Sequence, residues 1–289
     1  MKFLKYNNMP IHLRWELYPV AHEGKKAHYG GSFYEEVEWW KHPREVDRVS
    51  EMKHMIPEMV FLTAVRENNK SLWYRSFPFH FGMYSMIGFL GLLCLGAVMQ
   101  MVGLEVTAGD GLGGAVYYVT AAAGFFGMVL GVLGALGLFH RRLFDDNLKD
   151  FTRPQDIFNL LFLMSAFVLL LLSGIANPSF DGLRGYVYSV ITFNLSYMPN
   201  NPVVAAAVVL SSLVVAYIPL THMSHFVVKY FTYHKIRWDD EPNLRGGAYE
   251  KKIGEVLQYP VTWGANHINP KGEKKTWADV ATEEIEEGV

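Results

Sequence analysis

The sequence contains a single cysteine, Cys94, which lies inside an apolar stretch. One cysteine excludes an intrachain disulfide, a thiolate metal cluster and an iron–sulfur site built by this chain alone. Any iron–sulfur chemistry would therefore come from another protein. The formal net charge is only −2 over 289 residues, so bulk electrostatics do not indicate nucleic-acid binding. The first residues, Met1 to Tyr6, are followed by no apolar run, so we expect no signal peptide.

Charged residues are absent from the interiors of four long apolar segments. A helix that spans a bilayer needs about 20 mostly apolar residues, and each segment is that long. The sequence therefore predicts an all-α integral membrane protein with a four-helix transmembrane bundle and extended soluble flanks. The four segments cover residues 77–101, 114–139, 156–176 and 203–228.

The polar flanks on either side of the apolar centre carry their own signals. The stretch from Tyr18 to Trp40 mixes aromatic and charged residues, a composition enriched at protein interfaces. Apolar residues recur at helical spacing over 51–67, which predicts a short amphipathic helix along the membrane surface. Proline and glycine recur near the C-terminus, which favours an extended strap on a partner over a loose tail. We expect a docking region, a bundle and a strap over residues 1–72, 73–231 and 232–289.

The loops between the apolar segments differ in basic residues. The loop from His140 to Arg153 is rich in Lys and Arg, whereas residues 105–113 contain neither. Cytoplasmic loops carry an excess of Lys and Arg. We therefore expect a multi-pass protein of the cytoplasmic membrane with both termini on the cytoplasmic side. The long loop from Phe180 to Asn201 would lie along the outer interface rather than cross the membrane.

Two histidines lie inside the apolar segments. His80 is near the start of the first segment and His225 is near the end of the fourth. Because these helices run antiparallel in the expected topology, both histidines should lie one to two turns from the cytoplasmic face. Ionisable residues within a membrane usually face the bundle interior and mark function. Histidines at one depth on two helices fit the two axial ligands of a haem iron, and the alternative is a side chain hydrogen-bonded to a backbone carbonyl across helices.

Four further polar residues near that face are less specific candidates. His222 precedes His225 by one turn and is the alternative ligand. His140 ends the second segment beside Arg141, and its simplest interpretation is a solvated residue, with haem ligation as the alternative. A quinone headgroup needs hydrogen-bond partners near the haem. For this role we consider His222, Arg141 and Tyr84.

The second apolar segment contains a stripe of glycines. Spacings of three and four residues place these glycines on one face of a helix. Close helix packing is the simplest interpretation, as in other small-residue motifs, although a face beside a macrocycle would look the same. The stripe consists of Gly124, Gly127, Gly131, Gly134 and Gly137.

Three pieces of the chain resemble a family of membrane cytochromes b typified by the gamma subunit of respiratory nitrate reductase. Residues 79–82, Phe-His-Phe-Gly, resemble the first ligand motif of that family. The loop 140–156 resembles its basic cytoplasmic loop, and residues 219–225 resemble its Pro-x-Ser-x-x-x-His ligand stretch. The match covers about residues 73–237. The flanks look like the branch that accompanies heterodisulfide-reductase-like iron–sulfur proteins, including the transmembrane redox complexes of sulfate reducers.

The resemblance implies an electron-transfer subunit of a quinone-linked oxidoreductase complex. It would exchange electrons between the menaquinone pool and a heterodisulfide-reductase-like iron–sulfur subunit on the cytoplasmic side. One haem b would mediate, with His80 and His225 as axial ligands. Further subunits, a multihaem cytochrome c among them, are compatible with this branch. A non-redox membrane anchor and a small-solute transporter are the competing interpretations.

The chain also departs from the family pattern. The nitrate reductase gamma subunit has five spans and two haems, whereas a polar region here replaces the span that precedes the first ligand. Where the family places the histidines of its second haem, this chain has Leu90 and Ala207. We therefore expect a single haem b, on the cytoplasmic side.

Overall fold

The computed structural model describes nine stretches of the chain and separates them into two compact units. The membrane unit comprises Glu58–Thr221, and the flank unit comprises Met1–Pro57 together with His222–Val289. The described residues are 4, 23–29, 35–43, 47–194, 197, 199–221, 225, 244–263 and 274–283.

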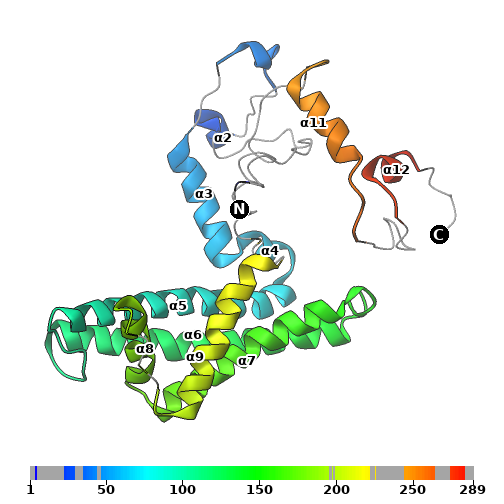
Figure 1. The fold of residues 1–289 in the computed structure, drawn as a ribbon. Helices are drawn as coiled ribbons and strands as arrows, with labels where there is room; N and C mark the ends of the chain where they lie inside the picture. Colours follow the sequence, from blue (N-terminus) through cyan, green and yellow to red (C-terminus); the bar gives the residue numbers. More distant parts are fainter. Residues whose placement is uncertain are drawn as a thin grey trace. The chain divides into compact units, whose positions relative to one another are not determined.

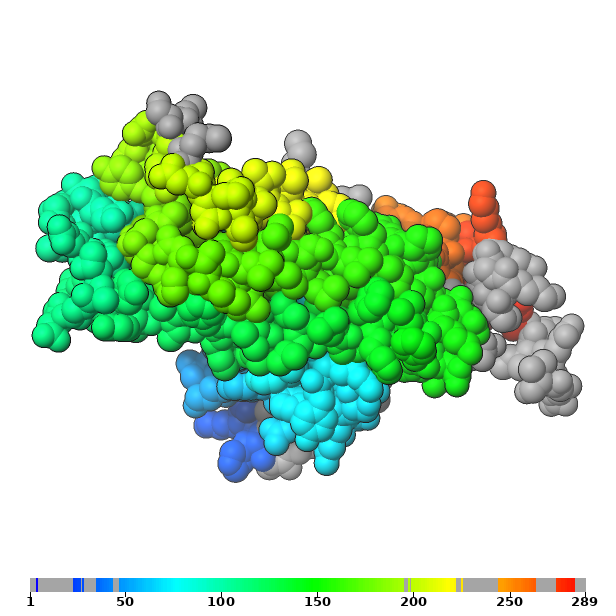
Figure 2. Space-filling view, turned by 90° about the horizontal axis from the view of Figure 1, so that it is seen from below, coloured from blue at the N-terminus to red at the C-terminus, as the bar shows by residue number. Residues whose placement is uncertain are grey.

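The membrane unit contains the four expected membrane-length helices (Figure 1). The prediction of a helical, multi-pass membrane protein is confirmed, whereas the side on which each terminus lies stays a prediction. Helix α7 packs against α6 on one side and against α9 on the other, and α9 lies beside α7 on the face shown in Figure 2. The four helices are α5 (Lys70–Met101), α6 (Gly111–Phe144), α7 (Pro154–Ala176) and α9 (Pro202–Tyr217), which the 3₁₀ turn η5 (Ile218–Leu220) extends.

Helices α5 and α6 touch backbone to backbone along the glycine stripe. A Cβ added to Gly82 would lie 2.6 Å from the backbone nitrogen of Gly131. A Cβ added to Gly134 would lie 2.5 Å from Cα of Phe79. Phe167 of α7 covers Gly131 from the other side. Protein atoms therefore cover the stripe in the described structure, and close helix packing is its role.

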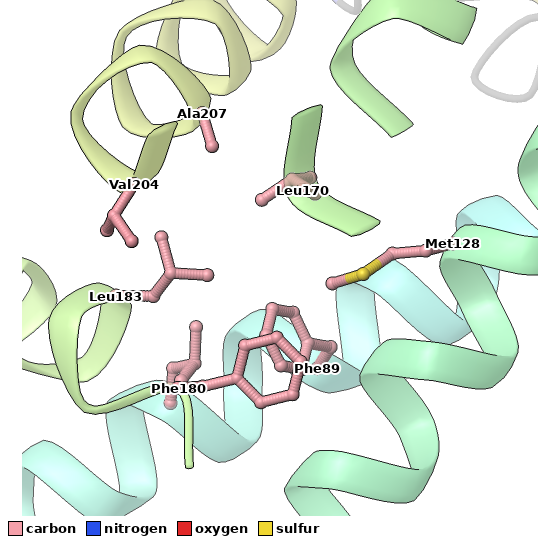
Figure 3. Close-up of a cluster of buried hydrophobic side chains, with 8 residues drawn as sticks. Phe89, Met128, Leu170, Phe180, Leu183, Val204 and Ala207 are labelled. Atoms are coloured by element: carbon pink, nitrogen blue, oxygen red, sulfur yellow. The ribbon is translucent and has the colours of Figure 1, made fainter. Parts of the chain in front are cut away.

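A cluster of buried side chains fills one end of the membrane unit (Figure 3). Helix α8 (Asp181–Ile191) reaches this cluster from the loop between α7 and α9 and packs against both α5 and α9. Phe180 precedes α8 with a positive φ of 53°, which directs its ring onto Phe89 at 5.0 Å between centroids. The described residues of this loop form no membrane-length helix, and Phe180 and Leu183 belong to the core, whereas its place along the outer interface stays a prediction. The cluster consists of Phe89, Leu93, Met128, Leu170, Phe180, Leu183, Val204 and Ala207.

The fourth membrane helix ends earlier than the sequence analysis expected. The α-helix stops at Tyr217, η5 follows, and Thr221 is extended, with φ −111° and ψ 175°. Pro219 explains the change, because proline has no backbone N–H to donate and its ring clashes with the preceding turn. Thr221 closes the turn by donating from its hydroxyl to the Ile218 carbonyl at 3.0 Å. The expectation of one unbroken helix to residue 228 is therefore wrong.

The amphipathic segment before the first span forms two helices. They are α3 (Arg48–Phe61) and α4 (Thr63–Asn68), separated by Leu62 with φ 53°. The Glu58 carboxylate accepts from the Thr63 hydroxyl at 2.6 Å and from the Ala64 N–H at 2.8 Å, which satisfies the start of α4. The predicted amphipathic helix is thus present, with a break that its apolar spacing did not reveal.

Short helices make up most of the described flank unit. Thr276 and Asp279 form a reciprocal capping box at the start of the C-terminal helix α12 (Trp277–Thr282). These hydrogen bonds hold the pKa of Asp279 below its usual range. An extended strap was expected near the C-terminus, but residues 248–257 are helical, so that expectation is wrong for this stretch. The helices are α2 (Lys25–Tyr29), η3 (Trp39–Lys41), α11 (Ala248–Leu257) and α12 (Trp277–Thr282), and the membrane unit adds η4 (Lys149–Phe151).

We predict that Gly82→Ala destabilises the membrane unit while Gly88→Ala on the same helix does not. The new methyl group at Gly82 would overlap the α6 backbone, whereas nothing lies within 4 Å of the corresponding position at Gly88. Overpacking of this kind costs about 1–3 kcal/mol, and glycine to alanine in an open helical position is neutral or stabilising by up to ~1 kcal/mol. Thermal unfolding in detergent measures both, and equal melting temperatures would contradict the backbone contact.

Candidate functional site

His80 lies within the first half of α5 and is half-buried. Its Nδ1 atom lies 2.8 Å from the backbone carbonyl oxygen of Ser76 and 3.2 Å from the Ser76 hydroxyl. A carbonyl oxygen can only accept, so Nδ1 carries the hydrogen in this bond. In a neutral imidazole the lone pair is then on Nε2, which is the arrangement of a metal-binding histidine whose other nitrogen is held by the protein.

The neighbouring side chain fixes the face of α5 on which His80 lies. Phe79 packs against the backbone contact at Gly134 and lies 6.3 Å from the Phe167 ring between centroids. Successive residues of a helix point about 100° apart, so His80 lies to one side of the α5–α6–α7 contact. The ring of Phe79 meets His80 edge-on, with 5.7 Å between centroids.

The two ends of the membrane unit differ in what occupies the space beside α5. At the end near Met101, α8 packs against both α5 and α9, and the buried cluster fills the interior. Ala207 stands at one of the two positions where the family has a histidine for its second haem. It is completely buried in that cluster. Leu90, the other, is 47% exposed on the outside of the membrane unit.

The two predicted haem ligands belong to different units of the described structure. His80 belongs to the membrane unit and His225 to the flank unit, where it is helical and exposed. His222, the alternative ligand, lies outside the described residues. Equal depth of the two histidines requires a continuous helix to His225, whereas α9 ends at Tyr217. The pairing of His80 with His225 therefore stays a prediction that rests on the resemblance of the motifs.

The basic candidates lie at the end of α6. Arg141 Nε is 3.1 Å from the Asp145 carboxylate, and Arg142 Nη1 is 3.9 Å from the Asp156 carboxylate of α7. These pairs neutralise much of the local charge. His140 is exposed, and its ring lies 4.8 Å from that of Phe144 between centroids. This end of the membrane unit, marked by the Arg142–Asp156 pair, is called the basic end below.

Tyr84 is engaged by the segment that precedes α5. Its hydroxyl donates to the backbone carbonyl oxygen of Met59 at 2.8 Å. Trp73 makes a parallel contact, donating from Nε1 to the Phe61 carbonyl at 2.8 Å. Arg66 lies over the Trp73 ring at 5.5 Å from its centroid, a cation–π contact. These bonds attach the end of α3 and the start of α4 to the surface of α5.

A buried polar pair that the sequence analysis did not single out joins α7 to α9 near the basic end. The Tyr217 hydroxyl donates to Asn159 Oδ1 at 2.7 Å. Asn159 is only 4% exposed, and its Nδ2 has no hydrogen-bond partner among the residues that the structure describes. In the sequence, the signal for this pair is an asparagine within a membrane-length apolar segment. That signal does not indicate function by itself, because a single amide in such a segment usually bonds across helices.

Comparison with known proteins assigns the family. The sequence model of the nitrate reductase gamma subunit family matches residues 64–239, more than half of the chain. The chain belongs to this family. The match includes all four membrane-length helices and the stretch that holds His225. No curated protein and no solved structure matches the chain.

Membership gives the chain its general role. The nitrate reductase gamma subunit family consists of membrane electron-transfer subunits of the cytochrome b type that belong to multisubunit complexes. The gamma-subunit resemblance is thereby confirmed, as is the membrane location. The branch that accompanies heterodisulfide-reductase-like proteins stays a prediction.

We predict that Tyr84→Phe loosens the segment before α5. Loss of the bond to Met59 removes about 1 kcal/mol of net stabilisation, which corresponds to local opening that is about fivefold more frequent. Hydrogen–deuterium exchange of the backbone over residues 58–69 should quicken accordingly. Tyr118→Phe, at a 57% exposed position of α6, is the matched control. Unchanged exchange in Tyr84→Phe would show that its hydroxyl does not hold this segment.

Proposed function

We propose that this chain is the haem b subunit of a quinone-linked respiratory complex, with His80 and His225 as the axial ligands of one haem. The observation that carries the proposal is the bond from His80 Nδ1 to the Ser76 carbonyl oxygen at 2.8 Å. It supplies the tautomer and the fixed ring that an iron ligand needs. When bound, the haem accepts and donates single electrons, and the chain contributes ligation, orientation and burial.

The packing of the opposite end supports one haem rather than two. Phe180 and Leu183 from the α7–α9 connection occupy the interior there, together with Ala207 of α9. A histidine in place of Ala207 would be enclosed by the core, and a histidine in place of Leu90 would point outward. The single haem therefore belongs near the basic end, beside His80.

The expected orientation places the basic end in the cytoplasm. The last turn of α6 and the loop to α7 hold Arg141, Arg142, Lys149 and Arg153, whereas the loop between α5 and α6 holds Glu105 and Asp110. This asymmetry follows the positive-inside rule. Both termini of the chain would then be cytoplasmic, and electrons would enter or leave on that side.

The partner on the cytoplasmic side would be an iron–sulfur subunit of the heterodisulfide-reductase-like type. One cysteine cannot hold a cluster in this chain, so the adjoining redox centre belongs to the partner. The aromatic residues of the flanks, Trp39 and Trp40 among them, suit an interface. On the membrane side the electrons are exchanged with menaquinone, for which His222, Arg141 and Tyr84 are the candidates from sequence.

One observation favours a second candidate function, that of a non-redox anchor. The fourth helix breaks at Pro219, before it reaches His225. An anchor would need the spans and the flanks but neither histidine. The two functions differ in a measurable way, because only the first requires haem.

We predict that the purified chain shows a b-type reduced-minus-oxidised spectrum with about one haem per chain, quantified as the pyridine haemochrome. His80→Ala should lose this signal, because an axial ligand and its hydrogen-bonded orientation are removed together. His140→Ala is the matched control and should keep it, since His140 is exposed at the end of α6. A folded wild-type protein without haem would leave the anchor function, and an unchanged signal in His80→Ala would assign the ligand elsewhere.

A further inference from the structure

Three buried polar atoms among the described residues have no hydrogen-bond partner. They are Asn159 Nδ2, Arg184 Nε and Ser211 Oγ. Arg184 pairs with Asp181 in the first turn of α8, beside the fully packed end of the membrane unit. Ser211 lies inside α9. Asn159 combines a donor without a partner with a hydrogen bond to the aromatic side chain of Tyr217.

We propose that Asn159, together with Tyr217, Phe158 and Phe162, forms a binding site for a quinone headgroup. The inference rests on the proposed quinone-linked function and assigns to it residues that the sequence analysis did not consider. A quinone headgroup is a flat ring with two carbonyl oxygens, so it needs aromatic surface and at least one hydrogen-bond donor. Both are present between α7 and α9.

The donor is the amide nitrogen of Asn159. The Tyr217 hydroxyl holds the amide oxygen at 2.7 Å, which orients the amide and leaves its nitrogen unsatisfied. Most buried polar groups in folded proteins are hydrogen-bonded, and each exception calls for an explanation. A bound carbonyl oxygen would satisfy this nitrogen without any change in charge.

The aromatic surface is linked to that amide through Tyr217, whose hydroxyl bonds to Asn159. The Tyr217 ring lies 5.8 Å from Phe158 and 5.3 Å from Phe162 between centroids, edge-on in both cases. Phe158 and Phe162 are stacked at 5.4 Å. Phe158 is 52% exposed on the face of α7 that would meet lipid. A lipid-soluble ligand can therefore approach along Phe158 and stack on rings that already line its path.

The position of the site favours a neutral ligand over a lipid phosphate. Asp156 lies one helical turn before Asn159, or about 4.5 Å along the axis, and pairs with Arg142. The Arg142–Asp156 charges one turn away are thus already paired, and the Asn159 donor is uncharged. Phosphate would instead favour an unpaired Arg or Lys.

Admission of the ring requires a side chain to move, because Asn159 is covered in this structure. Tyr217 is the side chain best placed to do so. It is the last residue of α9, and only the 3₁₀ turn Ile218–Leu220 follows it, so no full α-helical turn lies beyond it in the described helix. A tilt of the Tyr217 ring that keeps its hydroxyl bonded to Asn159 Oδ1 would open the amide nitrogen to the headgroup.

The test is a titration of the full chain in nanodiscs with 2-heptyl-4-hydroxyquinoline N-oxide, a fluorescent quinone-site inhibitor. Free inhibitor is measured after ultrafiltration, with empty nanodiscs as the blank. Asn159→Leu should raise the Kd at least about tenfold, the loss expected for one buried hydrogen bond. Tyr217→Phe keeps the ring but removes the hydroxyl that orients the amide, and it should raise the Kd about three- to tenfold. Ser211→Ala removes another partnerless polar atom, on α9, and should leave the Kd unchanged.

The outcomes separate this site from the proposed function. Wild-type Kd values in both Asn159→Leu and Tyr217→Phe, or no binding by a wild-type chain that carries haem, would overturn the site alone. A wild-type chain that binds the inhibitor but carries no haem would overturn the cytochrome function and keep the site. Melting temperatures monitor folding, and Tyr217→Phe decides if Asn159→Leu does not fold. Loss of a retained phospholipid instead of inhibitor binding, detected by native mass spectrometry, would assign the site to lipid and overturn the quinone.

Discussion

The backbone contact between α5 and α6 is the constraint on which the rest of the membrane unit depends. Membrane helices gain little from hydrophobic burial against one another, so close approach of their backbones is a main source of their association. Here Gly82 and Gly131 provide that approach, and Gly134 admits the backbone of Phe79. The contact sets the rotation of α5 about its axis, and hence the side to which His80 projects. His80, the proposed haem ligand, is held as firmly as the helix pair itself, because its own hydrogen bond also goes to the α5 backbone.

Much of this fold could be predicted from the sequence because membranes impose simple rules. An apolar segment of sufficient length must be helical in lipid, since no water satisfies its backbone, and the four spans followed from that rule. Pro219 also indicates a helix break. The apolar pattern continues past it, however, and that pattern predicts a span to residue 228. Insertion of Phe180 into the core could not be predicted, because its positive φ depends on tertiary contacts rather than on local sequence.

The candidate site was predictable only in part, for a similar reason. His80 stands out because an ionisable residue in an apolar segment is costly and therefore rare. Asn159 does not stand out, since one amide costs less and has a common structural explanation. Its significance appears only when the partner of each of its atoms is known, with Oδ1 bonded and Nδ2 not. Sequence shows which polar groups are present, whereas structure shows which of them are unsatisfied.

The uneven packing of the two ends bears on how electrons and charge would cross this protein. Two haems in series could carry electrons through the whole membrane. In this protein, α8, Phe180 and Leu183 occupy the interior of one end. With His80 and Asn159 both in the half that ends at Arg142 and Asp156, haem and quinone would meet on the same side of the bilayer. Electrons exchanged between them would then remain on that side. Any separation of charge across the membrane would require the quinone's protons, rather than its electrons, to cross the apolar core.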